Sequence, residues 1–155
     1  MTIARLLGFV SLASIAVTPY VCAGQTETRA ETAPGSAIRL FAAVEEVWGA
    51  SDAERLAALL DTTSVRIAVK PGTPLTSAQT RVAAAFLLQD QLRLVRTQDF
   101  RMTRFDCDKK RGICRAVALW TGDWGGRQGV RAVRVTLTAR PMAGRWLLTE
   151  IRAED

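Results

Sequence analysis

The sequence predicts an α+β domain in which helices come first and a mainly antiparallel sheet follows. In the first half of the chain, apolar residues recur every three or four positions, which is the spacing of helices that bury one face. Beyond the middle they alternate with polar residues, as in strands that bury one face. These two patterns predict the order helix, helix, strand, helix and four strands within residues 36–153.

Two helices are expected at the start of the domain. The first begins at Ser36 and buries an apolar stripe that includes Val44 and Trp48. The second is short and begins at Ser51, which forms a capping box with Glu54 three residues later. Both helices therefore present one apolar face to the rest of the domain.

A strand and a third helix come next. Residues 64–70 (SVRIAVK) alternate and predict a strand, which the proline and glycine at 71–74 end. Thr76 and Gln79 form a second capping box, and the helix is expected to run through Val82, Phe86 and Leu88 to about residue 92. Four further strands are expected near residues 97–107, 114–124, 130–139 and 145–152.

The N-terminal segment predicts export. Residues 1–23 combine a basic start, a twelve-residue apolar run and a small-residue end, the pattern of a cleaved secretory signal. The apolar run is too short to span a bilayer. We expect a mature chain that starts at Gly24, with a disordered leader over 24–35, no transmembrane segment and a periplasmic or secreted location. The alternatives are a lipoprotein anchored through Cys22 and an uncleaved membrane tether.

The segment CDKKRGIC, from Cys107 to Cys114, predicts a disulfide across a hairpin. Export and the loss of Cys22 leave two cysteines, an even number in an oxidising compartment. Pairing Asp108 with Ile113 places the two cysteines opposite each other, and Gly112 suits the turn. The alternatives are a zinc site, which needs about four ligands, and a redox site, which needs cysteines two residues apart.

The order of the elements resembles the NTF2-like, cystatin-related cone fold. The segments that carry the resemblance are FAAVEEVWGASDAERLAALLD, SVRIAV, LTSAQTRVAAAFLLQDQL and GRWLLTEIR, and it covers residues 36–153. Small secreted bacterial NTF2-like domains of unknown function are more similar than any enzyme branch. The resemblance implies a curved sheet around helices, with a cone that in some relatives holds a ligand.

The enzymes of this fold depend on residue types that are scarce here. Relatives similar to ketosteroid isomerase use a tyrosine and dehydratase-like relatives use histidines, but the sequence has no histidine and its single tyrosine, Tyr20, lies in the expected signal. Relatives similar to limonene epoxide hydrolase use an Asp–Arg–Asp arrangement. This chain has aspartates and arginines that could form such an arrangement, but no spacing identifies which of them would meet. The candidates are Asp61, Asp99, Asp123, Arg101 and Arg134.

Two carboxylates are the candidates for catalysis. Strand alternation from Trp146 places Glu150 inside the cone, whereas it is solvated or paired with an arginine if Leu147 and Ile151 face the core. Asp99 is the second candidate. We predict a non-catalytic binding module without cofactor or metal; the alternative is a small hydrolase or isomerase that acts on an apolar ligand with Glu150 or Asp99 and an arginine.

The charge distribution suggests an acidic partner for the sheet. Residues 93–152 carry 14 basic and 5 acidic side chains, a net +9, whereas residues 24–92 carry 6 and 8, a net −2. Arg115 and Arg134 on the sheet, and Trp120 and Arg127 in LWTGDWGGRQG, are the predicted binding residues for an acidic protein, lipid or glycan. The alternatives are a bias in composition, since 18 of the 21 basic residues are arginine, and a plain turn at the glycines. Nucleic acid is not expected.

The central hairpin also suggests a homodimer. A constant register from the cysteines places one apolar group of side chains on each side of the hairpin, so both faces of the sheet would be partly apolar. Because helices cover one face, a second copy of the sheet is expected on the other. The two groups are Phe100, Met102, Val117 and Leu119 on one side, and Phe105, Ala116, Ala118 and Trp120 on the other.

Overall fold

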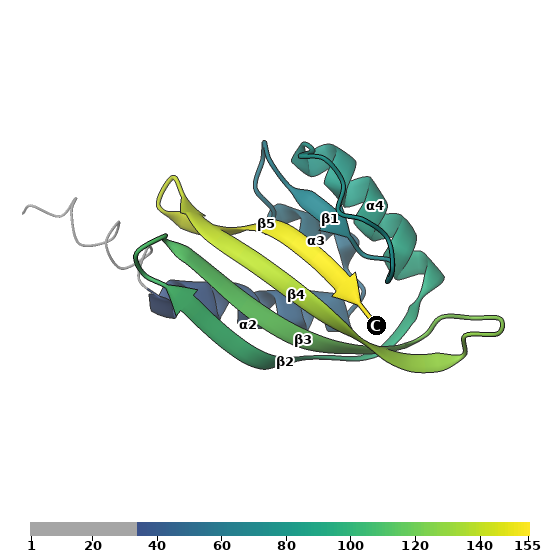
Figure 1. The fold of residues 1–155 in the computed structure, drawn as a ribbon. Coiled ribbons are helices and arrows are strands. Elements are labelled where there is room, and N and C mark those ends of the chain that lie inside the picture. Colours follow the sequence, from purple (N-terminus) through teal and green to yellow (C-terminus); the bar gives the residue numbers. More distant parts are fainter. Residues whose placement is uncertain (1–33) are drawn as a thin grey trace, which may run out of the picture.

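The computed structural model describes residues 34–155 (Figure 1). The expected signal over 1–23 and all but the last two residues of the expected leader lie outside this range. The elements follow the predicted order: α2 (Pro34–Gly49), α3 (Ala53–Ala58), β1 (Arg66–Ala68), α4 (Arg81–Leu94), β2 (Arg96–Asp108), β3 (Ile113–Asp123), β4 (Val130–Met142) and β5 (Arg145–Glu154).

The five strands form one curved sheet in the order β1-β5-β4-β3-β2. β1 pairs with β5 in parallel, and the other pairs are antiparallel. The three helices lie on one face of this sheet, with α2 packed along β2 and with α3 and α4 packed together near β1 (Figure 1). The predicted α+β cone is confirmed. The opposite face of the sheet, here called the outer face, carries none of the helices of residues 34–155.

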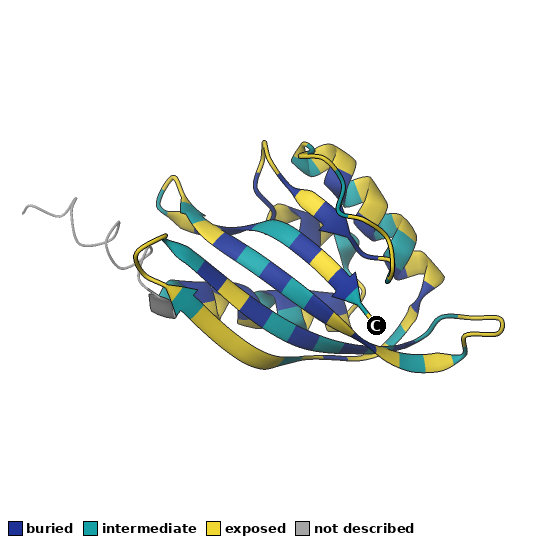
Figure 2. Ribbon diagram, in the orientation of Figure 1, coloured by how far each residue is buried: buried dark blue, intermediate teal, exposed yellow. Residues whose placement is uncertain are grey.

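Alternation along the strands separates the core from the outer face (Figure 2). Inside the cone, the ring of Trp48 stacks on Phe100 at 4.6 Å between centroids and meets Trp120 edge-on at 5.2 Å. The surrounding core includes five fully buried aliphatic side chains from α3, α4, β4 and β5: Leu56, Leu88, Leu137, Leu148 and Ile151. Large side chains therefore fill the middle of the cone.

The helices begin at other residues than the capping patterns predict. α2 begins at Pro34, two residues before Ser36. α3 is capped by Asp52, whose side chain accepts the N–H of Arg55 at 3.0 Å, and not by Ser51. Aspartate and serine have similar preferences for the N-cap position, so the sequence does not show whether Ser51 or Asp52 caps the helix.

The third helix starts later than predicted because tertiary contacts recruit its expected cap. Thr76 Oγ accepts the N–H of Ile67, and Gln79 forms a β-bridge with Val65. α4 is instead capped by Thr80. Leu88 is buried as expected, whereas Val82 and Phe86, which the same stripe would bury, are exposed.

The disulfide and its register are confirmed, but the predicted division of the hairpin into two apolar faces is wrong. Cys107 pairs and bonds with Cys114, and their Cα atoms are 4.1 Å apart. A register shift at Thr103 then places Met102 and the phenylalanine at 100 opposite Ala118 and Trp120, on the inner face. Of the eight side chains named for this hairpin, Val117 and Leu119 remain on the outer face.

Candidate functional site

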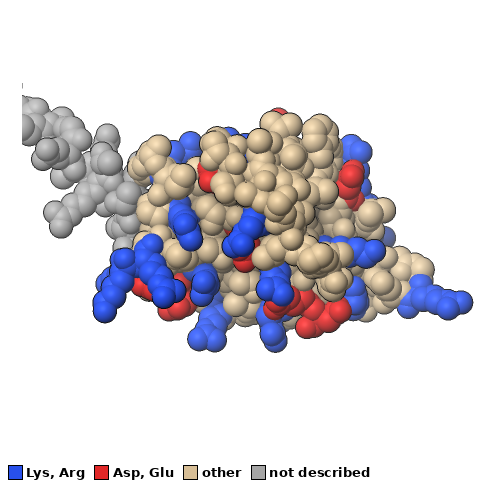
Figure 3. Space-filling model, turned by 45° about the horizontal axis from the view of Figure 1, so that its top comes forward, with Lys and Arg blue, Asp and Glu red and all other residues tan. Residues whose placement is uncertain are grey.

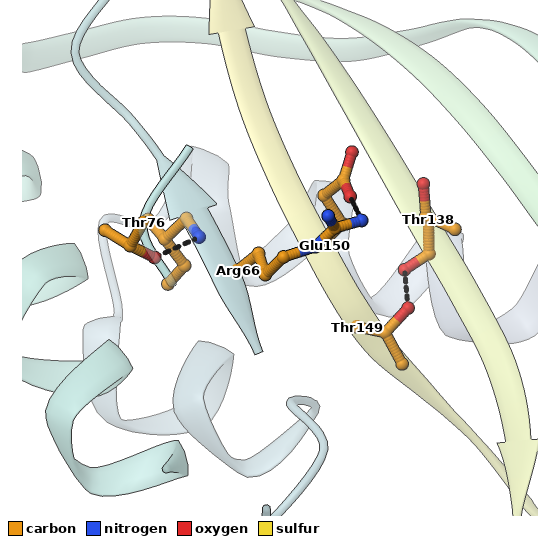
Figure 4. Close-up of polar contacts among 6 residues, drawn as sticks. Arg66, Thr76, Thr138, Thr149 and Glu150 are labelled. Atoms are coloured by element: carbon orange, nitrogen blue, oxygen red, sulfur yellow. Dashed lines mark hydrogen bonds and ion pairs between the residues drawn. The ribbon is translucent and has the colours of Figure 1, made fainter. Parts of the chain in front are cut away.

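Glu150 lies on the outer face of the sheet, at the end where β1, β5 and β4 meet. It is opposite Arg66 of β1 and Thr138 of β4, and its carboxylate forms an ion pair with Arg66 (Figure 4). A register shift leaves Thr149 unpaired, so Leu148 and the next inward residue, Ile151, both face the core. Of the two arrangements expected for Glu150, the pairing with an arginine is the one observed, because the alternation that would place Glu150 inside the cone fails at this bulge.

Asp99 lies on the edge strand β2, and its side chain is 53% exposed. Its carboxylate is 3.7 Å from Nε of Arg101, a surface pair. Strands β3 and β4 separate β2 from β5, so Asp99 and Glu150 do not belong to one site. The fold gives each predicted carboxylate an arginine neighbour but does not bring the two carboxylates together.

A polar hollow of about 370 Å³ opens beside the Glu150–Arg66 pair. One wall is the segment between α3 and β1, and the other belongs to β4 and β5. Its lining combines one carboxylate, two guanidinium groups and three hydroxyls with one methionine: Asp61, Thr63, Ser64, Arg66, Arg140, Met142 and Thr149. Polar groups that converge on one concave space can fix the orientation of a small ligand.

Asp61 is the buried charged residue of this hollow, with 3% of its surface exposed. Its Oδ1 accepts the N–H of Thr63 at 3.3 Å, and within residues 34–155 no cation lies within 4.0 Å of the carboxylate. The segment LAALLD gives no spacing that marks Asp61, because Arg140 and Met142 of the same hollow lie about 80 residues further along the chain.

A second cavity, of about 400 Å³, opens between α2 and β2. Its lining is mostly apolar and includes Phe41 and Phe105, whose rings meet edge-on at 5.6 Å. Glu45 reaches the same cavity, and its Oε2 accepts the N–H of Met102 at 2.6 Å. Neither predicted catalytic carboxylate lies here.

The glycine-rich segment after β3 is a turn. Gly125, Gly126 and Gly129 have positive φ, and the N–H of Trp124 bonds to the carbonyl of Gly129. The exposed Arg127 lies in this turn, which projects beyond the rest of the sheet (Figure 1) and carries a basic side chain at its tip (Figure 3). Arg127 is thus available to a partner.

Trp120 is not available, so its prediction as a binding residue is wrong. It is 0% exposed and lies between the rings of Trp48 and Trp124. Its Nε1 donates to Thr97 Oγ at 3.1 Å. Alternation at the end of β3 points this side chain inward, where it serves the core.

The outer face carries an arginine patch on β2, β3 and β4, defined by Arg104, Arg115, Arg134 and Arg140. All four are exposed, and none has a carboxylate within 4.0 Å in the part of the chain that the structure describes. Asp106 is opposite Arg115 on the neighbouring strand, but the two side chains do not form an ion pair. Figure 3 shows basic side chains along the sheet with fewer acidic ones between them.

The described helices include none that is long and apolar enough to cross a membrane. Among residues 34–155, no three histidine, cysteine or carboxylate side chains gather as they would around a metal ion.

The fold and these surfaces define a small NTF2-like domain. No family model matches the sequence, and no curated protein matches it. Several solved structures do share the fold. A DUF4783 family protein from Bacteroides ovatus has a TM-score of 0.61 at 12% identity, over 74% of this chain and 93% of that one.

Two further structures support the same assignment. A protein with a cystatin-like fold from Caulobacter vibrioides has a TM-score of 0.61 at 16% identity, over 77% of this chain and 87% of that one. A candidate dehydratase of the NTF2-like family from Streptomyces avermitilis has a TM-score of 0.56 at 16% identity, over 79% of this chain and 97% of that one. At such identities the likeness shows the fold alone.

Proposed function

We propose that this protein is a non-catalytic binding module that works in the periplasm or outside the cell and holds an acidic protein through the arginine patch. The observation that carries the proposal is that four exposed arginines on a helix-free sheet face lack acidic partners within residues 34–155. Uncompensated positive charge of this kind attracts and orients acidic partners.

The centre of the patch favours a protein over a lipid or glycan. Val117 lies opposite Arg104, and Leu119 lies opposite Arg134, so two half-buried apolar residues sit between the arginines. An apolar centre with arginine around it is the composition of protein interfaces. A lipid headgroup or a sulfated glycan would use the charge but not this centre.

The test compares charge reversal inside and outside the patch. The variant R115E/R134E should retain the fold but lose the acidic proteins that the wild type retains from an envelope extract, whereas R93E, which changes an exposed arginine in the last turn of α4, should keep them. The retained proteins should elute with salt, because exposed charges are screened. Equal retention by R115E/R134E and wild type would contradict the proposal, as would salt-resistant binding.

Heparin and vesicles of phosphatidylglycerol test the other occupants. The wild type could bind heparin or the vesicles more tightly than it binds acidic proteins, and R115E/R134E could abolish that binding. This result would show that the partner is a glycan or a lipid surface and not a protein. Sedimentation at micromolar concentration tests the homodimer: a monomer would remove the second copy of the chain as an occupant of this face.

The catalytic alternative is an enzyme built from a carboxylate and an arginine, and one observation favours it: the contact between Glu150 and Arg66. Against it, the pair lies on the outer face with the arginine side chain 54% exposed. Glu150→Gln and Asp99→Asn should therefore leave the biological activity of the protein intact. Loss of that activity in a variant that still folds and is still exported would establish the enzyme instead.

A further inference from the structure

We infer that the polar hollow beside β1 is a binding site for a small zwitterion that carries a free ammonium group and a free carboxylate, such as an amino acid or a short peptide. Of the four arginines of the patch, Arg140 also lines this hollow, whereas Arg115 and Arg134 do not. The inference rests on the burial of Asp61, on the placement of charge around it and on the size of the hollow.

The burial of Asp61 calls for a donor that the described chain does not provide. A carboxylate with 3% exposure loses most of its hydration, which is costly unless hydrogen bonds or a cation replace it. Oδ1 receives one N–H, from Thr63, and Oδ2 receives none from residues 34–155. Oδ2 is also not one of the fully enclosed polar atoms, so it is open to the hollow that Asp61 lines. An ammonium group in the hollow would supply both the charge and the hydrogen bonds.

The anionic end of the ligand is assigned to Arg140. Two guanidinium groups line the hollow, but Arg66 is already paired with Glu150 (Figure 4). Arg140 is exposed and has no carboxylate within 4.0 Å among the residues described, Asp61 included. Negative and positive groups thus line the same hollow without neutralising each other. A ligand with both charges is complementary to this arrangement, and a guanidinium binds a carboxylate through two parallel hydrogen bonds.

The size of the hollow limits the ligand. A volume of about 370 Å³ is near the lower end of small-molecule sites, which begin at about 300 Å³. An amino acid or dipeptide fits such a space, whereas a folded partner does not. Ser64 and Thr63 contribute hydroxyl groups at the wall, and Met142 provides the apolar contact for a side chain.

A local role for Asp61 is separable from ligand binding. The bond from Thr63 to Oδ1 closes a turn before β1, and an asparagine would accept it equally well. Asp61→Asn therefore keeps the shape and this hydrogen bond but removes the charge. It is the variant that distinguishes a carboxylate needed for a ligand from one that merely closes a turn.

The experiment titrates the wild type with the dipeptide Ala-Ala and follows the amide resonances of Thr63, Ser64 and Thr149 by NMR. We expect saturable shifts at these positions, and at least tenfold weaker binding of both acetyl-Ala-Ala and Ala-Ala-amide. Asp61→Asn should abolish the preference for the free amine, and Arg140→Gln the preference for the free carboxylate. Arg134→Gln, an arginine outside the hollow, should bind like the wild type.

The capped dipeptides keep the inference falsifiable even if a variant fails to fold. Absence of shifts at millimolar dipeptide, or equal affinity for free and capped dipeptides, would overturn it. The outcome does not depend on Arg115 and Arg134, since R115E/R134E should bind the dipeptide normally and Asp61→Asn should still retain acidic proteins.

Discussion

Reducing the Cys107–Cys114 disulfide should lower the free energy of unfolding by about 2.5 kcal/mol. The cysteines are seven residues apart, so the bond closes a loop of eight residues in the unfolded chain. The chain-entropy relation gives about 8 cal/mol/K for eight residues, which is about 2.5 kcal/mol at 25 °C. The folded hairpin gains little from the bond, because the strands pair on both sides of the turn without it.

The assay is urea unfolding of the wild type with and without reductant. With a denaturant dependence of about 1–3 kcal/mol/M, the loss shifts the midpoint down by about 0.8–2.5 M. The reduced wild type keeps both sulfur atoms in place, so buried volume at Cys114 is nearly unchanged and the shift reports the covalent link. C107A/C114A is the control, since reductant should not move its midpoint. A shift below about 0.3 M in the wild type would refute the loop-entropy argument.

Three further predictions concern packing, charge and register. Gly122→Ala should cost about 1–3 kcal/mol, because its Cβ would lie 2.7 Å from Cγ1 of Val95; thermal unfolding measures the loss, and an unchanged melting temperature would contradict the close contact. Glu150→Gln should cost less than about 1 kcal/mol, since its arginine partner is solvated; a larger loss in urea would show a buried role. Deleting Thr103 at the bulge should preserve the fold, whereas deleting Thr136 from a regular stretch of β4 should abolish it by near-UV circular dichroism; equal outcomes would count against the register.

Local sequence patterns were sufficient to predict the element order and the disulfide. The periods of 3.6 and 2 separate the helices from the strands, and a short hairpin loop leaves few registers for Cys107 and Cys114. Trp48 and Trp146 were expected in the core and are buried. These features depend on residues that are close in sequence, where spacing alone decides which side chains share a face.

The errors fall where a tertiary contact or one unpaired residue changes a local pattern. Thr76 would cap a helix in isolation, but the N–H of Ile67 takes its hydroxyl. The bulge at Thr103 places Phe100 and Met102 on the face opposite to Val117 and Leu119, with which they were predicted to share a side. Single unpaired residues have no signature in the hydrophobic alternation, so every assignment beyond them along the strand is reversed. The faces of β2 and β5 could not be fixed from sequence for this reason.

The unpaired Thr149 that places Glu150 on the outer face also helps to form the candidate ligand site. If Thr149 were paired, continued alternation from Leu148 would direct Glu150 into the core. Burying a carboxylate there would be costly in free energy. With Thr149 unpaired, Glu150 reaches Arg66 on the outer face, and Thr149 lines the hollow. Because Glu150 pairs with one guanidinium, Arg140 is left as the uncompensated cation across the hollow from the Asp61 segment. The unpaired residue in β5 thus turns Glu150 toward Arg66 and leaves Arg140 for the carboxylate of the ligand. Asp61 and Arg140 are so far apart in sequence that their spacing does not indicate that they line one hollow.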